Sequence, residues 1–292
     1  MTMKINYQNS SKLLCVIGDP IGHSLSPLLQ NTMLEYLGED AIYLAVPVKA
    51  GTVKDFVSAA KTLGILGFNL TMPHKEDIIP LLSSMTPEAM ACKSVNSVRI
   101  KDGKLEGHST DGIGFRRSIQ DLGWDYPGNT VTILGAGGAA KSVALTASMA
   151  GAKQVHVVNR TLARAEQLCS GQGNMFPHSL TQLPELLPST DILINATPMG
   201  MAGCGQASIP DLTALKQGAL CMDCIYAPAL PPFMQEAKKQ GHIAGNGIGM
   251  LVYQAIFALE FFLDRSFDEE TIGILGKKLM EISGVNLFGE KS

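Results

Sequence analysis

The chain has 292 residues, of which 46% are hydrophobic and 17% charged, and its formal net charge is −3. This length accommodates two domains of ordinary size, and the small net charge gives no broad electrostatic reason to bind nucleic acid or an anionic membrane. The longest apolar run, residues 251–263, is interrupted by Gln254 and Glu260, so no membrane-spanning segment is predicted. The N-terminus lacks the apolar core of a signal peptide, and the six cysteines favour free thiols in a reducing cytoplasm.

Short β-rich runs alternate with helical patterns along the chain. The runs are LLCVIG, AIYLAVPV, ILGFNLT, VTILG, VHVVN, DILINATP and ALCMDCIY. Such alternation is typical of βαβ units and mostly parallel sheets, so we predict an α/β fold. Residues 94–110 are the exception, because they indicate a β-hairpin around Asp102-Gly103. A second block of alternation begins near Thr130, and we expect a domain boundary near Asp111 and Gly112.

The motif HSLSP follows the first strand. Ser26 followed by Pro27 predicts a helix start, with Ser26 as the N-cap. Ser24 has no part in that cap. Two hydroxyls beside a helix N-terminus suit a carboxylate ligand.

The motif NLTMPHK, residues 69–75, follows the strand ILGF, and ligands of open α/β sheets bind at such strand ends. We expect Lys75 in the first turn of the next helix, where the dipole disfavours its charge and suits proton transfer, although Glu76 and Asp77 offset this effect. Asp111, in the motif STDG, is either a plain N-cap or a further functional group.

The stretch VTILGAGGAAKSVAL, residues 131–145, has two interpretations. A loop that cradles nucleotide triphosphates requires glycine immediately before its lysine, and that position is Ala140. The dinucleotide-binding turn accepts alanine there and requires the strand before it and the helix after it. Gly135 then permits the tight turn, and Gly137 lets the backbone approach a pyrophosphate.

The next strand ends in VHVVNRTLARA. NAD-binding folds usually carry an acid here, but this chain has Asn159 and Arg160, with Arg164 one helical turn later. Two guanidinium groups suit the 2′-phosphate of NADP, and Thr161 is placed to cap the helix and bind the same phosphate. Solvated surface charges are the alternative.

Two further features are informative. Cys221 and Cys224 form a lone C-x-x-C without a second ligand pair, so we interpret them as small apolar residues rather than a zinc site. Gln254 shares a helical face with Met250, Phe257 and Phe261, where a buried amide needs a partner such as a substrate oxygen.

A set of motifs, in order over nearly the whole chain, resembles that of the shikimate dehydrogenase family, including its quinate/shikimate relatives: GDPIGHSLSP, NLTMPHK, SVN, STDG, GAGGAA, NRT and NGIGMLVYQ. The resemblance implies reversible, NADPH-linked reduction of 3-dehydroshikimate to shikimate, in aromatic amino acid biosynthesis. It also implies a substrate-binding domain of residues 1–111, completed by 248–292, and a Rossmann NADP-binding domain of residues 112–247. The C-terminal helices are expected to return to the N-terminal domain, and the chain is expected to be a monomer or homodimer without nucleic-acid or membrane partners.

The same resemblance implies residue roles. Lys75 is the catalytic acid/base, with Asp111 beside it. The substrate-binding residues are Ser24, Ser26, Asn69, Thr71, Asn96, Asp111, Tyr226 and Gln254. The NADP-binding residues are Gly135, Ala136, Gly137, Gly138, Ala139, Asn159, Arg160, Thr161, Arg164, Thr197, Cys224, Gly247 and Met250.

The chain departs from the family pattern at His108 and Ser109 before Thr-Asp, at Pro231 after Tyr226, and at Pro87. These changes leave the preference for shikimate or quinate open. A non-catalytic NADP-binding sensor on the same scaffold is a further alternative, opposed by the presence of Lys75 and Asp111, which a sensor does not need.

Overall fold

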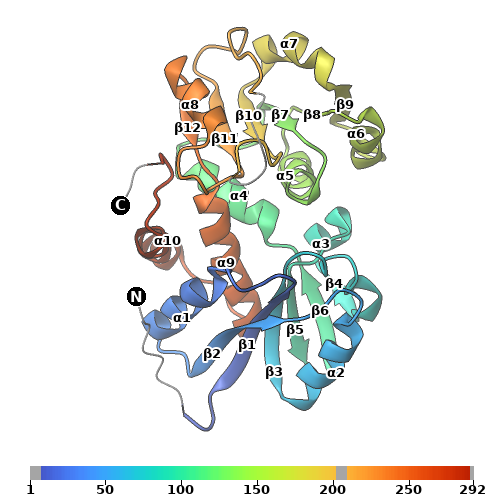
Figure 1. The fold of residues 1–292 in the computed structure, drawn as a ribbon, viewed down its shortest axis with the longest axis vertical. Helices are drawn as coiled ribbons and strands as arrows, with labels where there is room; N and C mark the ends of the chain where they lie inside the picture. The colour runs from blue at the N-terminus through green and yellow to red at the C-terminus, as the bar shows by residue number, and fades with distance from the viewer. Residues whose placement is uncertain (1–7, 202–208, 290–292) are drawn as a thin grey trace. The chain divides into compact units, whose positions relative to one another are not determined.

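The computed structural model describes residues 8–201 and 209–289 (Figure 1). The chain divides into two compact units. Unit 1 comprises Met1–Thr110 and Gln254–Leu279, and unit 2 comprises Asp111–Tyr253 and Met280–Ser292. The C-terminal helices thus return to the N-terminal unit from Gln254 to Leu279, as expected, whereas the last residues group with unit 2.

Unit 1 is built on one mixed sheet. Its strands are β1 (Lys12–Gly18), β2 (Ala41–Pro47), β3 (Ile65–Leu70), β4 (Ser84–Met85), β5 (Ser97–Lys101) and β6 (Lys104–His108). Its helices are α1 (Ser26–Leu37), α2 (Val53–Thr62), the 3-10 turn η1 (Ile79–Leu81), α3 (Pro87–Cys92), and the parts of α9 (Ile248–Leu263) and α10 (Glu269–Ser283) that belong to it.

The sheet order is β2-β1-β3-β5-β6-β4. The pairs of β1 with β2 and β3 are parallel, and β5 and β6 form the predicted antiparallel hairpin. Asp102 and Gly103 have φ values of 51° and 73°, the left-handed conformations that a tight two-residue turn requires. The hairpin prediction is confirmed.

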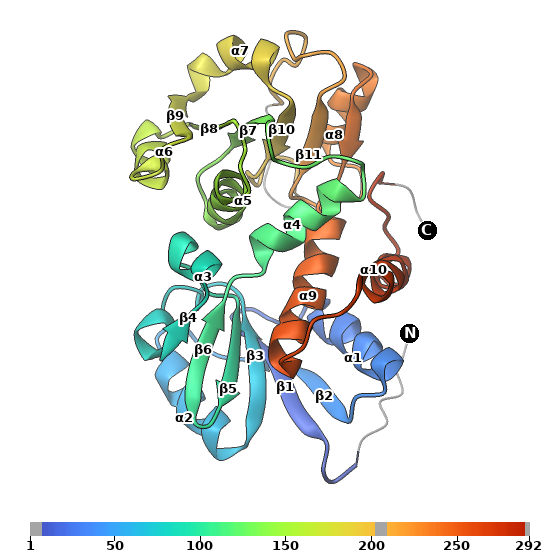
Figure 2. The same cartoon turned by 180° about the vertical axis from the view of Figure 1, so that it is seen from behind.

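Helices cover both faces of this sheet. Cys15 and Ile17 of β1 pack in a core with Val57 of α2, whereas the α1 side chain of Gln30 donates to the carbonyl of Ala255 in α9. Figure 1 shows α2 on the viewer's side of the sheet, and Figure 2 shows α9 on the other. This burial on both faces explains why β1 is a nearly continuous apolar run rather than an alternating one.

Unit 2 is built on a second sheet. Its strands are β7 (Thr130–Leu134), β8 (Gln154–Asn159), β9 (Met175–Ser179), β10 (Ile192–Asn195), β11 (Leu220–Asp223) and β12 (Ile243–Gly245). Its helices are α4 (Asp111–Gln120), α5 (Gly138–Met149), α6 (Leu162–Cys169), α7 (Leu183–Leu186), α8 (Pro232–Lys239), the 3-10 turns η2 (Leu180–Gln182) and η3 (Leu187–Ser189), and the start of α9.

The strand order β12-β11-β10-β7-β8-β9, with parallel pairing throughout the described strands, is the doubly wound order of dinucleotide-binding sheets. The order reverses between β7 and β10. Ligands of open α/β sheets bind outside the carboxyl ends of the strands at such a reversal. The candidate ligand-binding segments of unit 2 are therefore those that follow β7, β8, β10 and β11.

The α/β prediction is confirmed in both units. The short strands β4, β9 and β12 were not predicted, because residues such as Pro177 and His178 in β9 give no apolar run. In the described parts of the chain, no helix is both long and apolar enough to cross a membrane.

Candidate functional site

The serine pair lies where β1 leads into α1. The helix begins at Ser26, but Leu25 occupies the N-cap position, and no side chain caps the helix. Ser24 Oγ instead accepts a hydrogen bond of 3.2 Å from the backbone N–H of Ser26. The prediction that Ser26 is the N-cap was wrong by one position, and the hydroxyl that supports the turn is that of Ser24. Both serines are half-buried.

Asn69, in β3, is embedded in a buried network. Tyr43 Oη donates to Asn69 Oδ1 at 2.6 Å, and Asn69 Nδ2 donates to the carbonyl of Asn96 at 2.9 Å and to Ser97 Oγ at 2.8 Å. Asn69 is only 7% exposed, and both ends of its amide have partners within the protein. This arrangement makes Asn69 a support for the segment around Asn96.

Asn96 is the centre of a second set of bonds. Its Oδ1 accepts from Thr110 N at 2.9 Å, and its Nδ2 donates to Thr110 Oγ1 at 2.9 Å. The same nitrogen lies 3.5 Å from Gln254 Oε1. Val95 N donates to the carbonyl of Lys75 at 2.9 Å, so the Lys75 segment lies next to Asn96 in the fold. Residues far apart in sequence are thus brought together in unit 1.

Lys75 does not lie in a helix. The residues after β3 form turns until η1, so the argument from a helix dipole at Lys75 was wrong. The preceding His74 is fully buried, and its Nε2 donates to the carbonyl of Val48 at 2.7 Å. Thr71 is half-buried, and its carbonyl accepts from His74 N. The side chain of His74 therefore anchors the turn that presents Lys75.

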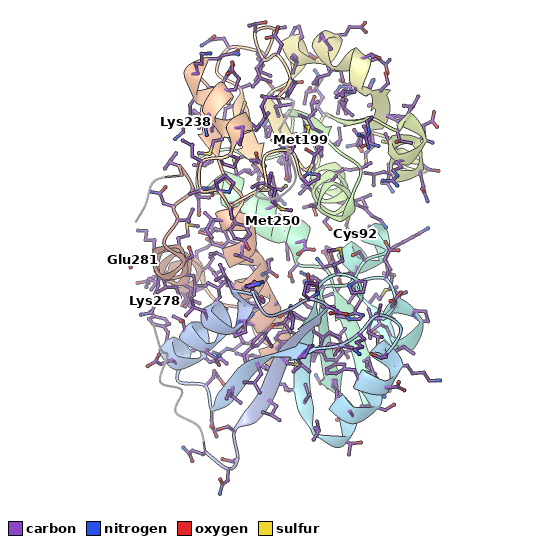
Figure 3. The ribbon with its side chains drawn as sticks, in the orientation of Figure 1. Cys92, Met199, Lys238, Met250, Lys278 and Glu281 are labelled. Carbon is purple, nitrogen blue, oxygen red and sulfur yellow. The ribbon has the colours of Figure 1, made fainter. Side chains whose placement is uncertain are left out.

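Gln254 lies on a face of α9 that is half-exposed rather than buried. Met250, Phe257 and Phe261 share this face and are likewise half-buried, whereas the residues between them are mostly buried. Met250 is labelled in Figure 3. This face is partly rather than fully buried: Phe261 packs against His108 and Arg99, and the Gln254 amide has a partner in Asn96, as an amide on an apolar face requires.

In unit 2, the glycine-rich turn joins β7 to α5. Gly135 has φ 112° and a Cβ there would lie 3.0 Å from the carbonyl oxygen of Ala196, so only glycine fits without strain. Gly137 is the N-cap of α5, and a Cβ on Gly137 or Gly138 would meet no protein atom within 4 Å. The helix N-terminus is thus open to an approaching anion. Ala136 and Ala139 are half-buried in this turn.

The segment after β8 carries exposed positive charge. Arg160 and Arg164 are exposed, and neither forms an ion pair within the described residues. Asn159 Nδ2 donates to the carbonyl of Thr161 at 2.8 Å. Thr161 occupies the N-cap of α6, as predicted, but its hydroxyl makes no capping bond. Both guanidinium groups and this hydroxyl suit an external anion.

The segment after β11 meets both the segment after β10 and the segment after β12. Cys224 N donates to the carbonyl of Asn195 at 2.8 Å, and Gly247 N donates to the carbonyl of Ile225 at 3.0 Å. A Cβ on Gly247 would lie 2.1 Å from the carbonyl oxygen of Cys224, so the segments after β11 and β12 approach as closely as glycine allows. Thr197 is bonded to Asn195. Thr197, Cys224 and Gly247, three of the implied NADP-binding residues, therefore belong to one connected group.

Tyr226 and Asp111 also belong to unit 2 and are half-buried. Asp111 is the first residue of α4, and its charge helps to raise the pKa of Cys224, although burial is the main cause. Cys221 and Cys224 are free cysteines. Among the described residues, no three His, Cys, Asp or Glu side chains are grouped so as to hold a metal ion.

The residues that depart from the family pattern have structural partners. His108 Nδ1 and Thr86 Oγ1 share a hydrogen bond of 2.7 Å, and the His108 ring packs against Phe261. Burial lowers the pKa of His108, partly opposed by Glu88. Ser109 is buried, Pro87 begins α3, and Pro231 is the N-cap of α8.

Several buried polar residues of these segments were not predicted. Tyr43 and His74 in unit 1, and Asn195 and Asp223 in unit 2, are fully or almost fully buried. Burial raises the pKa of Asp223 to about 7. The signal that was available for Asn195 and Asp223 is a polar residue at the end of an otherwise apolar strand, where burial demands a partner.

The strand order and the glycine turn of unit 2, beside a separate α/β unit, define a two-unit dinucleotide-binding protein. Residues 16–98 match the family model "Shikimate dehydrogenase substrate binding domain", and residues 118–223 match the model "Shikimate / quinate 5-dehydrogenase". The chain is 36% identical over 279 residues to the shikimate dehydrogenase (NADP(+)) of Alkaliphilus metalliredigens, which spans 92% of this chain and 98% of that protein. The chain belongs to the shikimate dehydrogenase family.

Solved structures of the same fold differ in function. The shikimate 5-dehydrogenase of Listeria monocytogenes, in complex with shikimate and NAD, is 30% identical with a TM-score of 0.86, covering 95% of this chain and 99% of that chain. The ligand-free 5-ketofructose reductase of Gluconobacter sp. strain CHM43 is also 30% identical, with a TM-score of 0.83, covering 93% and 100%. The scaffold alone therefore does not fix the substrate.

Proposed function

We propose that this chain is an NADP-dependent shikimate dehydrogenase, which interconverts 3-dehydroshikimate and shikimate. The reaction belongs to the formation of aromatic amino acids, and the free cysteines of the described residues are typical of a cytoplasmic protein. The observation that carries the proposal is the group formed by Asn96, Thr110 and Gln254, next to the turn that presents Lys75. This group offers amide and hydroxyl partners for a polyhydroxylated ring, and the backbone of Lys75 is bonded to the residue that precedes Asn96.

The cofactor residues fit a phosphorylated dinucleotide. Open space at Gly137 and Gly138 leaves room for a pyrophosphate at the N-terminus of α5. Arg160 and Arg164 suit the 2′-phosphate, since their guanidinium groups are exposed and uncommitted within the described residues. When bound, NADPH supplies the hydride, and NADP⁺ accepts it in the reverse direction.

The chain's own residues bind the substrate and move a proton. Ser24, Ser26 and Gln254 hold the substrate carboxylate, and Thr71 and Asn96 hold its hydroxyls. In the reductive direction, hydride addition to the carbonyl carbon places negative charge on the carbonyl oxygen. The Lys75 ammonium stabilises that charge and donates the proton, so that a neutral hydroxyl results. Asp111 is the second catalytic group, and Tyr226 contributes a hydroxyl to the substrate.

Asn69 supports the substrate site through its hydrogen bonds to the Asn96 segment. Its amide is used by Tyr43, Ser97 and the backbone of Asn96, so its contribution is to hold Asn96 in place. Direct contact of Asn69 with the substrate stays part of the proposal.

A steady-state assay tests the proposal. The purified full chain is supplied with shikimate or quinate, each with NADP⁺ or NAD⁺, and reduced nicotinamide is followed by absorbance. The highest kcat/KM is expected for shikimate with NADP⁺. A higher value for quinate would reassign the substrate, and nucleotide binding without turnover of either compound would make the chain a sensor.

A further inference from the structure

A buried carboxylate at the end of β11 is outside the roles assigned so far. Asp223 is 0% exposed, and its neighbour in register on β10, Asn195, is 1% exposed. Asn195 Nδ2 donates to both carboxylate oxygens of Asp223, each at 3.1 Å, and Ile225 N donates to Oδ1 at 2.9 Å. Burying a carboxylate is costly, so a fold that keeps one in place must use the hydrogen bonds that it accepts.

These bonds continue into the loop after β10. Because the amide nitrogen of Asn195 faces Asp223, its Oδ1 faces the loop, where it accepts from Thr197 N at 3.1 Å and from Thr197 Oγ1 at 2.6 Å. Thr197 Oγ1 in turn accepts from Met199 N at 3.3 Å. Met199 is labelled in Figure 3. The Asn195 amide nitrogen also donates to the carbonyl of Met199 at 3.4 Å. The carboxylate, with this second acceptor, fixes the direction in which the Asn195 amide points, and the amide orders residues 197–199.

The same loop touches the glycine-rich turn. A Cβ on Gly135 would lie 3.1 Å from Thr197 Cγ2 and 3.0 Å from the carbonyl oxygen of Ala196. On its other side, the carboxylate fixes Ile225, between Cys224 and Tyr226. Asp223 thus supports the loop after β10, which borders the reversal in strand order where a dinucleotide binds in such sheets, and the neighbouring segment after β11.

We propose that Asp223 is a positioning residue for the nicotinamide nucleotide, which acts through Asn195 to hold residues 197–199 and 224–226 in their binding conformation. The proposal rests on the proposed function, because it presumes that the nucleotide occupies this edge. Asp223 itself is too deeply buried to touch the nucleotide.

The protonation state of Asp223 makes the proposal measurable. Burial raises its pKa to about 7. Its partners, Asn195 Nδ2 and Ile225 N, are donors, so the ionised carboxylate accepts from them with both oxygens, whereas protonation of either oxygen places an O–H against a donor. The other titratable groups around it are Cys224, and through Cys224 also Asp111 of α4 and Tyr126. Burial raises the pKa of both Cys224 and Tyr126, so both stay neutral as Asp223 ionises.

Nucleotide binding should therefore tighten as the pH rises through about 7. The test measures the Kd for NADPH of the full chain by fluorescence titration, above and below this pH. Asp223→Asn keeps the size of the side chain but sets an amide N–H against one of the donors. We expect the Kd at alkaline pH to rise roughly ten-fold, and the pH dependence to flatten.

Asp191→Asn is the matched control. Asp191 immediately precedes β10, at the end of that strand opposite to Asn195. Like Asp223, it accepts a backbone N–H, from Thr130 at 2.8 Å, and it also pairs with Lys216. Its loss removes comparable bonds away from the nucleotide edge. Asp191→Asn should leave both the Kd and its pH profile as in the wild type.

The outcomes separate the two proposals. A folded Asp223→Asn protein with the wild-type Kd and pH profile overturns the positioning role, and so does an equal rise of the Kd in both variants. A wild-type chain that does not bind NADPH overturns the proposed function together with this inference. Should Asp223→Asn not fold, the pH dependence of the wild-type Kd decides. This second titration uses NADH, because the 2′-phosphate of NADPH itself titrates near neutral pH and NADH lacks it. A Kd for NADH that does not change with pH then overturns the role.

Discussion

The two units present their candidate residues in different ways. In unit 1, the implied substrate residues are side-chain amides and hydroxyls that also hold the interior together, as Asn69 and Asn96 do. In unit 2, the implied cofactor residues offer backbone at Gly137 and exposed guanidinium groups at Arg160 and Arg164. In much of unit 1, a substitution should therefore lower both the stability of the fold and the affinity for substrate. In unit 2, a substitution should be able to change nucleotide affinity without changing stability. Lys75 is the position in unit 1 where chemistry should separate from binding.

Lys75→Ala should have the largest effect. If Lys75 transfers the proton, turnover should fall by about 10²–10⁴, the range typical of a general acid/base. The KM for shikimate should change much less, since Ser24, Ser26 and Gln254 are proposed to hold the carboxylate. Steady-state kinetics with shikimate and NADP⁺ over a range of pH measures both.

Lys61→Ala is the control for charge, because Lys61 is an exposed lysine on α2 of the same unit. It should leave turnover unchanged. Near-normal turnover in Lys75→Ala, with an unchanged pH profile, would remove Lys75 from the mechanism and make His108 the candidate acid/base. The bond of His108 to Thr86 in the structure argues against that outcome.

The sequence predicted the features of each unit that depend on neighbouring residues. The hairpin followed from Asp102-Gly103, and the glycine turn of unit 2 followed from Gly135 and Gly137 between a strand and a helix. These signals are local, because they concern φ values and strand-to-helix turns. The error at Lys75 was also local: the turns after β3 do not continue into a helix until the short η1.

The supporting contacts were not predicted, because they join residues distant in sequence. Tyr43 and Asn69 are 26 residues apart, and Asn195 and Asp223 are 28 apart. Nothing in either stretch alone indicates its partner. The sequence does show polar residues in apolar strands, but which buried amide meets which carboxylate is decided by strand order and register.

Arg160→Ala and Arg164→Ala should have the next largest effect. Each loses a charge-assisted contact to the 2′-phosphate, so each should weaken NADP⁺ binding by about 1.5–3 kcal/mol and leave NAD⁺ nearly unaffected. Stability should stay within about 0.5 kcal/mol, because both side chains are exposed. The KM for each nucleotide and the thermal midpoint measure this separation.

Gln167→Ala is the control, since Gln167 is exposed on the same helix α6. It should change neither KM. Equal losses with NADP⁺ and NAD⁺ in the arginine variants would mean that these arginines do not recognise the 2′-phosphate.

Two substitutions in the glycine-rich turn should have different effects: Gly137→Ala should weaken NADP⁺ binding, and Gly135→Ala should lower the stability of the protein. A Cβ on Gly137 meets no protein atom, so the fold should tolerate it, but it would occupy the space proposed for the pyrophosphate. The KM for NADP⁺ should rise roughly ten-fold with an unchanged thermal midpoint. Gly135→Ala should instead destabilise the protein by about 1–3 kcal/mol, because its φ is 112°. Wild-type binding by Gly137→Ala would place the pyrophosphate elsewhere.

The smallest effect is expected away from the binding edges, at the ion pair of Arg116 and Asp125 in unit 2. Arg116 Nε and Nη2 donate to the two oxygens of Asp125 at 2.7 and 2.8 Å, and this pairing lowers the pKa of Asp125 to about 2. The lowered pKa stabilises the folded state at neutral pH. This contribution is lost as the pH falls from the ordinary aspartate pKa of 3.8 through the lowered pKa of about 2. Because the two side chains are 33% and 35% exposed, solvent screening limits the contribution to about 1 kcal/mol.

Asp125→Asn should therefore lower the free energy of unfolding by about 1 kcal/mol at neutral pH, and the difference from the wild type should vanish below about pH 2. The neighbouring Trp124 is the single tryptophan of the chain, so its fluorescence during denaturant titration follows this part of unit 2. The KM for NADP⁺ should stay unchanged, because the pair lies on α4 and the loop after it rather than at the strand ends that carry the glycine turn and the arginines. A loss of the same size at both pH values would show that the pair stabilises the fold through packing rather than through its charge.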